Sequence, residues 1–390
     1  MSETKNFILF SKLPTVILSA ILGLLALLVS PLLFVHEAGA TNERVNHKVA
    51  ATLPPPTITF SNTVVVADYG GESGLGASTA IVNGKPAIAY FNDSYESLMY
   101  VQAADENGTS WNEPITIETQ KGYLDYINLI VVDGKPAIAY RETASNNSNS
   151  AVKFVTSADA NGTSWGSPII AVDSTSRFDG LYLSLAIIDG KPAVSYQSSN
   201  PANSNDRSLR FTRANDTAGT SWGSPEVVDT VGQPGSFSSL ASVNGKPAIA
   251  YYRLSGQDLV YAQAFDAAGN SWKTPLVVDS AGIVGIAPQL EVVDNRPAIA
   301  YQDLSNRDTK YVRAADADGD SWGAPVIVDS NISINGVFSA YLTMGIIAGK
   351  PAIINSQSGE LRYYRAVDST GSSWNSVLNL QPAIVRLTSL

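Results

Sequence analysis

The 390-residue chain contains no cysteine and only two histidines, and these absences exclude several kinds of chemistry. Without cysteine there is no disulfide, no thiol nucleophile and no thiolate metal site. Both histidines, His36 and His47, precede the repeats described below. A histidine-based catalytic triad or a histidine zinc site inside the repeats is therefore excluded.

Positive charge is also scarce, since 25 Lys and Arg residues face 35 Asp and Glu residues, for a formal net charge of −10. A surface with this balance repels phosphate backbones and anionic lipid headgroups, so we expect no nucleic-acid partner. Helical periodicity is lacking after the first forty residues, which predicts few helices in the folded part.

The N-terminus has the pattern of an export signal. Two lysines precede an apolar run at residues 13–35, and a small-x-small cleavage pattern follows at residues 38–40. We therefore predict a signal peptide over residues 1–40 and a linker over residues 41–58. The apolar run is long enough to span a bilayer, so an uncleaved membrane anchor is the alternative. Both readings predict a secreted, periplasmic or cell-surface protein, which touches the membrane, through this segment, only if the segment is uncleaved.

Two short blocks recur six times from residue 59 onward. The first reads GKPAIAY at residues 84–90 and returns, with changes, from residues 134, 190, 245, 295 and 349. The second reads Asp-x-x-Gly-x-Ser-Trp, and its six copies end at the six tryptophans of the chain: Trp111, Trp165, Trp222, Trp272, Trp322 and Trp374. The period is about 53 residues, in the range of propeller blades.

Each repeat contains four short apolar stretches separated by turn signals. In the fourth repeat, for example, Asn244-Gly245 separates the first two stretches, and this dipeptide is a strong signal for a tight hairpin. The pattern predicts an all-β fold, in which six four-stranded antiparallel units close into one six-bladed β-propeller over residues 59–390. A linear solenoid is the alternative, but it would expose strand edges at both ends.

Ring closure is expected to involve the start of the repeats. Residues 63–68 (TVVVAD) match the fourth strand of a repeat, as in residues 275–279, yet they precede the first repeat. The last copy of that strand has lost both its proline and its terminal aspartate. We therefore predict that residues 63–68 join the last blade, where they add to or replace its outer strand.

The turn before each tryptophan resembles the Asp-box of the sialidase-like (BNR) propellers, Ser-x-Asp-x-Gly-x-Thr-Trp. The Gly, Ser and Trp match in all six copies, whereas the Asp lies one residue earlier than in the family. In that family the box is a structural turn remote from the active site, so the resemblance implies a scaffold role for the six tryptophans. The chain is also similar to bacterial repeat proteins built from GKPAIAYYD-type units.

One copy of the turn carries three carboxylates within five residues, Asp316, Asp318 and Asp320, which resembles half of a calcium loop. The distant bidentate glutamate of a complete loop is missing. Calcium is therefore the one cofactor that we consider for this chain. The alternative is that these aspartates bond backbone amides of their own turn.

Candidate ligand contacts lie on the face of the propeller opposite the tryptophan turns. Strand direction alternates, so the loops between the second and third strands emerge beside the loops that join successive repeats. These loops are irregular in length and charge. The residues that we consider as ligand contacts there are Tyr126, Arg141, Glu142, Arg207, Arg253, Asp303 and Arg307. The alternative is that they form solvated ion pairs, which contribute little individually.

The favoured function is a non-catalytic binding or adhesion propeller, whose partner is a carbohydrate or an extracellular protein. The resemblance implies an alternative, a sialidase-like glycoside hydrolase acting at the central funnel. That site would need three arginines around a carboxylate, for which Arg141, Arg207 and Arg253 are candidates, together with a Tyr–Glu nucleophile pair and an acidic Asp. No Tyr–Glu pair is evident, and the Arg-Ile-Pro signature of the family is absent. A structural extracellular protein is the third possibility.

Overall fold

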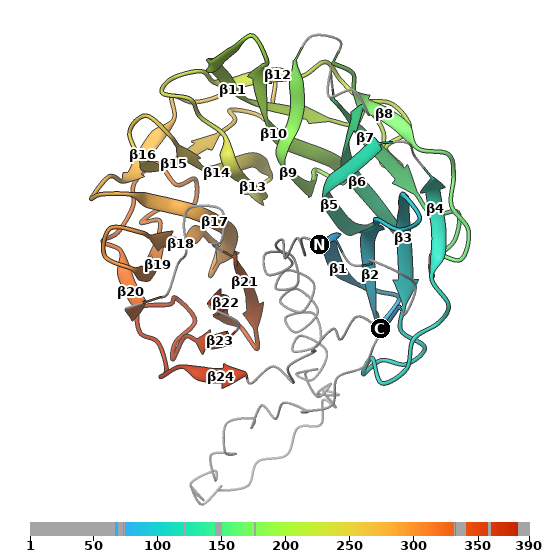
Figure 1. Ribbon diagram of the computed structural model, residues 1–390. Helices are drawn as coiled ribbons and strands as arrows, with labels where there is room; N and C mark the ends of the chain where they lie inside the picture. The colour runs from blue at the N-terminus through green and yellow to red at the C-terminus, as the bar shows by residue number, and fades with distance from the viewer. Residues whose placement is uncertain are drawn as a thin grey trace, which may run out of the picture.

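The computed structural model describes residues 67–68, 73, 75–119, 122–144, 150–174, 177–330, 332, 341–357 and 360–380. These residues form six four-stranded antiparallel sheets arranged in a ring, and no helix occurs among them (Figure 1). The predicted six-bladed propeller is thus confirmed. The predicted signal segment, the linker and residues 63–66 lie outside the described residues. Within the described part, no helix has the length and apolar character needed to cross a membrane.

Each of the first three sheets is built from four consecutive strands. The first sheet contains β1 (Leu75–Val82), β2 (Lys85–Asn92), β3 (Ser97–Gln102) and β4 (Ile115–Thr119). The second contains β5 (Gly122–Val132), β6 (Lys135–Ala144), β7 (Ser150–Thr156) and β8 (Ile169–Val172). The third contains β9 (Phe178–Ile188), β10 (Lys191–Asn200), β11 (Asn203–Arg213) and β12 (Glu226–Asp229).

The other three sheets follow the same order. The fourth contains β13 (Ser236–Val243), β14 (Lys246–Arg253), β15 (Asp258–Gln263) and β16 (Leu276–Asp279). The fifth contains β17 (Val284–Val293), β18 (Arg296–Asp303), β19 (Asp308–Arg313) and β20 (Val326–Ser330). The sixth contains β21 (Tyr341–Ile347), β22 (Lys350–Gln357), β23 (Glu360–Arg365) and β24 (Leu378–Leu380).

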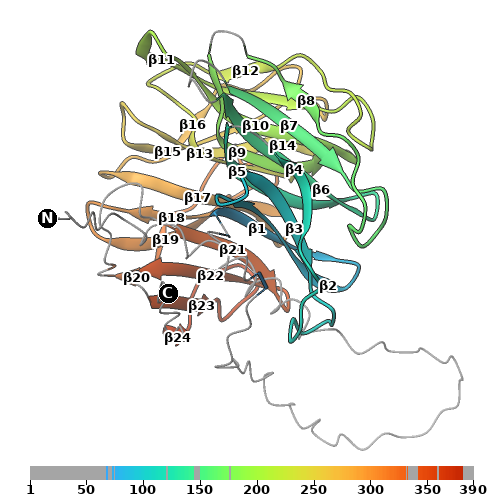
Figure 2. The same ribbon diagram turned by 45° about the vertical axis from the view of Figure 1, so that its right-hand side comes forward.

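The first strand of every sheet lies at the centre of the ring and the fourth at its outside (Figure 1), and the turned view shows several inner strands side by side (Figure 2). Serine side chains bond successive inner strands: the Leu129 amide donates to Ser78 Oγ, and the Leu290 amide to Ser239 Oγ, both at 3.0 Å. The hairpins between the first two strands have the expected geometry, because Asn244 and Gly245 have φ of 50° and 74°.

The core lies between neighbouring sheets rather than inside one of them. Between the second and third sheets, for example, Val132 and Phe154 pack with Leu185 and Tyr196. The second strand of each sheet is therefore covered on both faces, and its residues are almost all buried. Repeated alanines on this strand suit the close approach of two sheets.

An aromatic contact joins each sheet to the turn of the next. The Phe154 ring, on β7, lies edge-to-face against Trp222 of the third sheet, with ring centroids 5.3 Å apart. Gly219, in the turn before that tryptophan, has φ of 71°, and a Cβ there would lie 2.4 Å from the Phe154 ring. The Trp222 indole N–H donates to the Gly219 carbonyl at 3.1 Å. The turn glycine thus makes room for the ring, and the tryptophan covers it.

The same contact recurs at four further junctions. The ring pairs are Tyr100–Trp165, Phe211–Trp272, Tyr261–Trp322 and Tyr311–Trp374, with centroids 5.1 to 5.3 Å apart. Where the ring belongs to a tyrosine, its hydroxyl also donates to a carbonyl of the turn, as Tyr100 does to Asn161 at 3.0 Å. Because five junctions share the geometry, the six-copy block is the feature that spaces the sheets around the ring.

A buried tyrosine–carboxylate pair forms a second contact between sheets. The Tyr251 hydroxyl donates to Asp229 at the end of the preceding sheet at 2.5 Å, and Tyr301 donates to Asp279 at 2.6 Å. In each pair the two residues are 22 positions apart. Tyr140 and Glu118 form the equivalent pair.

The tyrosine–carboxylate spacing also accounts for Asp68. The Tyr90 hydroxyl donates to Asp68 at 2.7 Å across the same 22 positions. In the sixth sheet the register position that corresponds to Asp279 is Leu380, which cannot accept this bond. Asp68 therefore supplies the carboxylate that the last repeat lacks. β24 forms the outer strand of the sixth sheet in the described residues. The placement of residues 63–66 beside it stays a prediction.

One inner strand carries an acidic group where the others are apolar or small. Glu291 on β17 pairs with Ala298, and the corresponding residues of the third and fourth sheets are Ala186 and Ala241. Burial raises the pKa of Glu291 to about 7. An unfolded glutamate titrates near 4.3, so the folded state favours the protonated form over the interval between these values.

Glu291 is therefore expected to make the protein less stable as the pH rises from about 4.3 to about 7, after which the penalty stays constant. Glu291→Gln should raise the melting temperature at pH 8 and have a much smaller effect at pH 4.5. Thermal melts of both proteins over this range measure the difference. The exposed Glu113→Gln is the control; an equal gain for Glu291→Gln at both pH values would contradict the pKa.

The turn glycines allow a test of the aromatic contact between sheets. Gly219→Ala places a methyl group against the Phe154 ring, whereas Gly245 has nearly the same φ and no atom within 4 Å of its Cβ position. Both variants carry the same backbone strain, so their difference isolates the steric clash. We expect Gly219→Ala to lose about 1–3 kcal/mol more than Gly245→Ala in denaturant unfolding. Equal losses would show that the ring does not need this space.

Candidate functional site

The inner strands share an unusual backbone feature near their first residues. The register between the first and second strands shifts there in the first five sheets. One residue at each shift has a left-handed conformation, with φ between 48° and 59°: Gly76, Tyr126, Tyr182, Phe237 and Ala287. Such a bulge is a property of the fold, and glycine is the residue that adopts it without strain.

Three consecutive sheets place an aromatic residue at this position. The Tyr126 and Tyr182 rings lie with centroids 5.5 Å apart, and the Tyr182 and Phe237 rings 4.8 Å apart. All three residues are half-buried. They form a continuous arc, which we call the aromatic crescent, on the face where one repeat joins the next. A bulky residue in the left-handed region is a genuine outlier and costs about 1–3 kcal/mol.

Polar groups flank the crescent. The Arg141 guanidinium carbon lies 5.8 Å from the centre of the Tyr126 ring, and Arg141 Nη1 donates to Asp125 Oδ2 at 2.9 Å. Burial, reinforced by Tyr182 and Asp125, raises the pKa of Tyr126 well above its usual value. Burial also raises the pKa of Tyr182, while Arg207 opposes that shift. Both phenols therefore stay neutral near pH 7 and can donate and accept hydrogen bonds.

The three arginines considered for a carboxylate grip have separate partners. Arg141 pairs with Asp125, as described above. Arg253 Nη2 pairs with Asp229 at 3.0 Å, in the contact between the third and fourth sheets. Arg207 Nε donates to the Ser204 carbonyl at 2.9 Å, within β11, and its charge acts on Tyr182 of the crescent. Each guanidinium is thus held within its own sheet or junction.

The other predicted loop-face residues do not join the crescent in any contact that the structure records. Glu142 pairs with Lys153 at 2.9 Å. Asp303 is fully buried and pairs with Lys310 at 2.6 Å, so it belongs to the scaffold of the fifth sheet. Arg307 is exposed in the turn between β18 and β19, and its carbonyl accepts from the Ile332 amide.

The three aspartates considered for calcium are engaged in other contacts. Asp316 accepts the backbone amides of Asp318, Asp320 and Ser321. Asp318 Oδ1 accepts from Asn244 of the fourth sheet at 2.8 Å. Asp320 pairs with Lys273 at 2.6 Å, and the same ammonium lies 4.0 Å from Asp318 Oδ2. Among the described residues there is no group of three metal-ligating side chains.

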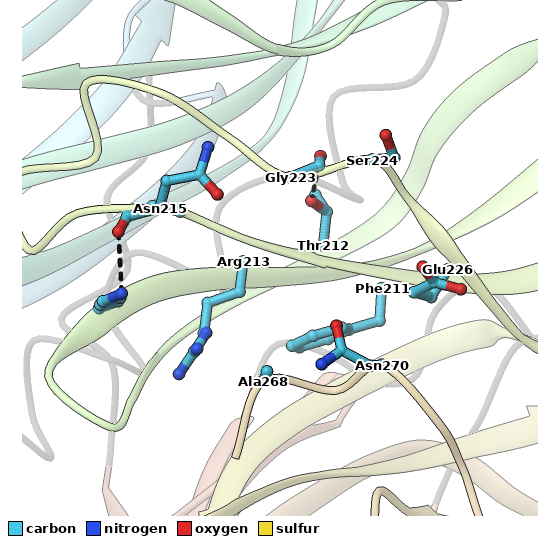
Figure 3. Close-up of a pocket in the computed structure, with 11 residues that line it drawn as sticks. Phe211, Thr212, Arg213, Asn215, Gly223, Ser224, Glu226, Ala268 and Asn270 are labelled. Atoms are coloured by element: carbon cyan, nitrogen blue, oxygen red, sulfur yellow. Dashed lines mark hydrogen bonds between the residues drawn. The ribbon is translucent and has the colours of Figure 1, made fainter. Parts of the chain in front are cut away.

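A small cavity lies on the opposite face, between the third and fourth sheets (Figure 3). Its volume is about 210 Å³. Its walls come from the start of β10, from β11, from the segments before and after Trp222, from the start of β12, and from the turn that follows β15. The lining includes Lys191, Phe211, Thr212, Arg213, Glu226 and Ala268.

Comparison with known proteins adds a fold likeness only. No family model matches the chain, and no curated protein matches it. A mutant Aleuria aurantia lectin in complex with α-methyl-L-fucoside is 14% identical, over 82% of this chain and 98% of that chain, with a TM-score of 0.47. The NanB sialidase of Streptococcus pneumoniae is 13% identical, over 82% of this chain and 63% of that chain, with a TM-score of 0.41. These likenesses carry no argument about ligand or activity.

The sequence therefore identified part of the crescent. Tyr126 and Arg141, both predicted, are in contact. Tyr182 and Phe237 were not among the predicted ligand contacts. A signal for them existed, because aligning the repeats on the GKPAIAY block places aromatic residues at one position in three successive repeats. The left-handed conformation of this position comes from a register shift in the strand, which the residue pattern does not reveal.

The calcium hypothesis has a direct test. Because Asp316 accepts backbone amides of its own turn and Asp318 bonds the neighbouring sheet, we expect neither calcium nor EDTA to change the melting temperature. Asp318→Ala should lower it in both conditions, since the bond to Asn244 is lost. A rise of several degrees with calcium that disappears in Asp318→Ala would establish a calcium site.

Proposed function

We propose that the chain is an exported, non-catalytic carbohydrate-binding propeller, and that the aromatic crescent is its ligand platform. The observation that carries the proposal is the aromatic occupancy of a left-handed position in three successive sheets. The first and fifth sheets fill the same position with Gly76 and Ala287, so the fold does not require a ring there. Strain that a fold does not need is typical of binding sites.

The chemistry of the crescent suits a sugar. Its rings present an apolar surface to the C–H faces of a saccharide, and the two phenols can bond its hydroxyls. Arg141 and Asp125 supply a donor and an acceptor beside the platform. Their charges cancel, which favours an uncharged glycan. Export rests on residues 1–40, and a secreted or cell-surface location is part of the proposal.

The hydrolase alternative has less support. A sialidase-like site needs a cluster of guanidinium groups to hold the substrate's carboxylate. Arg141 is paired with an aspartate inside the second sheet, and Arg253 with an aspartate between the third and fourth sheets. The proposal therefore assigns the loop face to binding.

Substituting glycine at the left-handed position separates function from stability. Tyr182→Gly removes the central ring and the backbone strain together, so we expect at least a tenfold loss of glycan affinity with little loss of stability, or a gain. Ala287→Gly, at the same repeat position without a ring, should leave binding unchanged. A glycan array on the mature protein identifies the ligand, and calorimetric titration with thermal melts measures the variants.

Two results would reject the proposal. The first is a mature, folded protein that binds no glycan on the array. The second is a Tyr182→Gly variant with unchanged affinity. Turnover of a fluorogenic sialoside, lost on substitution of Arg141, Arg207 or Arg253, would instead support the hydrolase.

A further inference from the structure

The cavity between the third and fourth sheets differs from the corresponding part of the other junctions. Thr212 on β11 is buried and pairs with Val194 of β10. The residue at that register position is Val155 in the second sheet and Val312 in the fifth. The position is thus apolar in the first, second, fourth and fifth sheets, whereas the sixth has Tyr364 there.

Two further lining positions show the same departure. Glu226 on β12 pairs with Phe211, and the corresponding residues are Ile169 in the second sheet and Leu276 in the fourth. Asn215 follows the strand bridge to Trp222, where most of the other repeats have alanine. Glu226 and Asn215 therefore replace apolar residues around the cavity. The Thr212 side chain instead shares a sheet face with Val194, toward the second sheet, and its hydroxyl donates to the Gly223 carbonyl at 2.8 Å. A polar exception within a repeat otherwise apolar at these positions points to function, because the fold alone does not require it.

The next junction explains why this space is open. There, Asp318 of the fifth sheet reaches back to the fourth, where it accepts from Asn244 at 2.8 Å and lies 3.5 Å from Lys246. Between the third and fourth sheets the residue at the position of Asp318 is Ala268. Lys191 and Arg213 then face the cavity in place of Lys246 and Gln263. The carboxylate that fills one junction is absent from the other.

The charges around the cavity balance. Lys191 Nζ donates to the Asn215 carbonyl at 2.8 Å, and Arg213 Nη1 lies 3.4 Å from Asp189 Oδ2. Asp189 does not line the cavity, but it offsets the charge of Arg213, which leaves Lys191 and Glu226 as one cation and one anion of the walls. Neither an anion nor a cation gains a net attraction from these walls.

The remaining groups suit hydroxyls. Arg213 has N–H groups beyond the one bonded to Asp189, Glu226 is an acceptor, and Asn270 offers both a donor and an acceptor. A hydroxyl both donates and accepts, so adjacent hydroxyls can bond a guanidinium and a carboxylate at the same time. The Phe211 side chain adds an apolar surface to the lining (Figure 3).

We propose that this cavity is a second binding site, which takes one uncharged sugar unit. It lies among the turns that connect the first to the second and the third to the fourth strands, on the face opposite the crescent. The second site is argued from its own residues and does not depend on the crescent. With both sites, one molecule could bridge glycans on its two faces.

The experiment titrates the mature protein with methyl glycosides of neutral hexoses and deoxyhexoses, and with glucuronate as the charged probe. Saturation-transfer NMR detects binding and calorimetry measures the affinity. We expect a neutral methyl glycoside to bind, and glucuronate to bind at least tenfold more weakly because Glu226 lies in the wall. The same titration in a Tyr182→Gly background, in which the central ring of the crescent is removed, should still show binding at the cavity, which separates the second site from the crescent.

The chain itself supplies variants that close the cavity. Ala268→Asp introduces the residue of the fifth sheet, and the double variant Thr212→Val, Glu226→Leu restores residues found in other sheets. Each should lower the affinity for the glycoside at least tenfold while the protein stays folded in thermal melts. Ala218→Asp is the matched control, because it makes the same change at the junction between the second and third sheets.

Three results would overturn the second site. They are the absence of binding by every neutral glycoside, tighter binding of glucuronate, and affinity retained in both the Ala268→Asp and the double variant. Should Ala268→Asp fail to fold, the double variant alone decides, since both of its residues already occur in sibling sheets. Glycoside binding that is lost in Tyr182→Gly and kept in the double variant would assign the sugar to the crescent alone.

Discussion

The propeller depends on one contact above all, the packing of an aromatic side chain into the turn of the next sheet. A four-stranded sheet of this size has two apolar faces and is stable only when both are covered. The Phe154 ring meets that need at the point where Gly219 leaves space and Trp222 covers it. The same geometry recurs at five junctions, so these sheets are positioned by their neighbours. The loops on the two faces of the propeller are therefore free to differ in sequence.

The sequence predicted the scaffold well because its determinants are local. Turn residues such as Asn244 and Gly245 specify a hairpin within a few positions, and the repeated tryptophans mark the period. The aromatic crescent was only partly predicted, because the position of Tyr182 and Phe237 depends on a bulge in the strand. The predicted arginine contacts said less about where the crescent lies. Arg253 reads as a loop residue, yet in the structure it is bonded to Asp229 between two sheets.

Departures from the repeat are more informative than the repeat. Tyr196 is one departure, because the residue 22 positions before it is Ser174 and not a carboxylate. The Tyr196 hydroxyl is buried and has no hydrogen-bond partner in the described part of the chain. The adjoining aromatic crescent and the cavity beside Ala268 are departures of the same kind. All three lie in the sector formed by the second, third and fourth sheets. The departures that carry the two proposed sites are thus concentrated in one half of the propeller.

The left-handed position recurs in the inner strands of five sheets, and it holds side chains of very different size. The backbone there is set by the bulge and not by the side chain, since glycine, alanine, tyrosine and phenylalanine all occur with φ between 48° and 59°. A single codon change can therefore add or remove a ring without disturbing the sheets. Under the proposed function, the number of adjacent positions that hold an aromatic side chain sets the length of the ligand platform. Proteins of this architecture could diverge in specificity by changing that number alone.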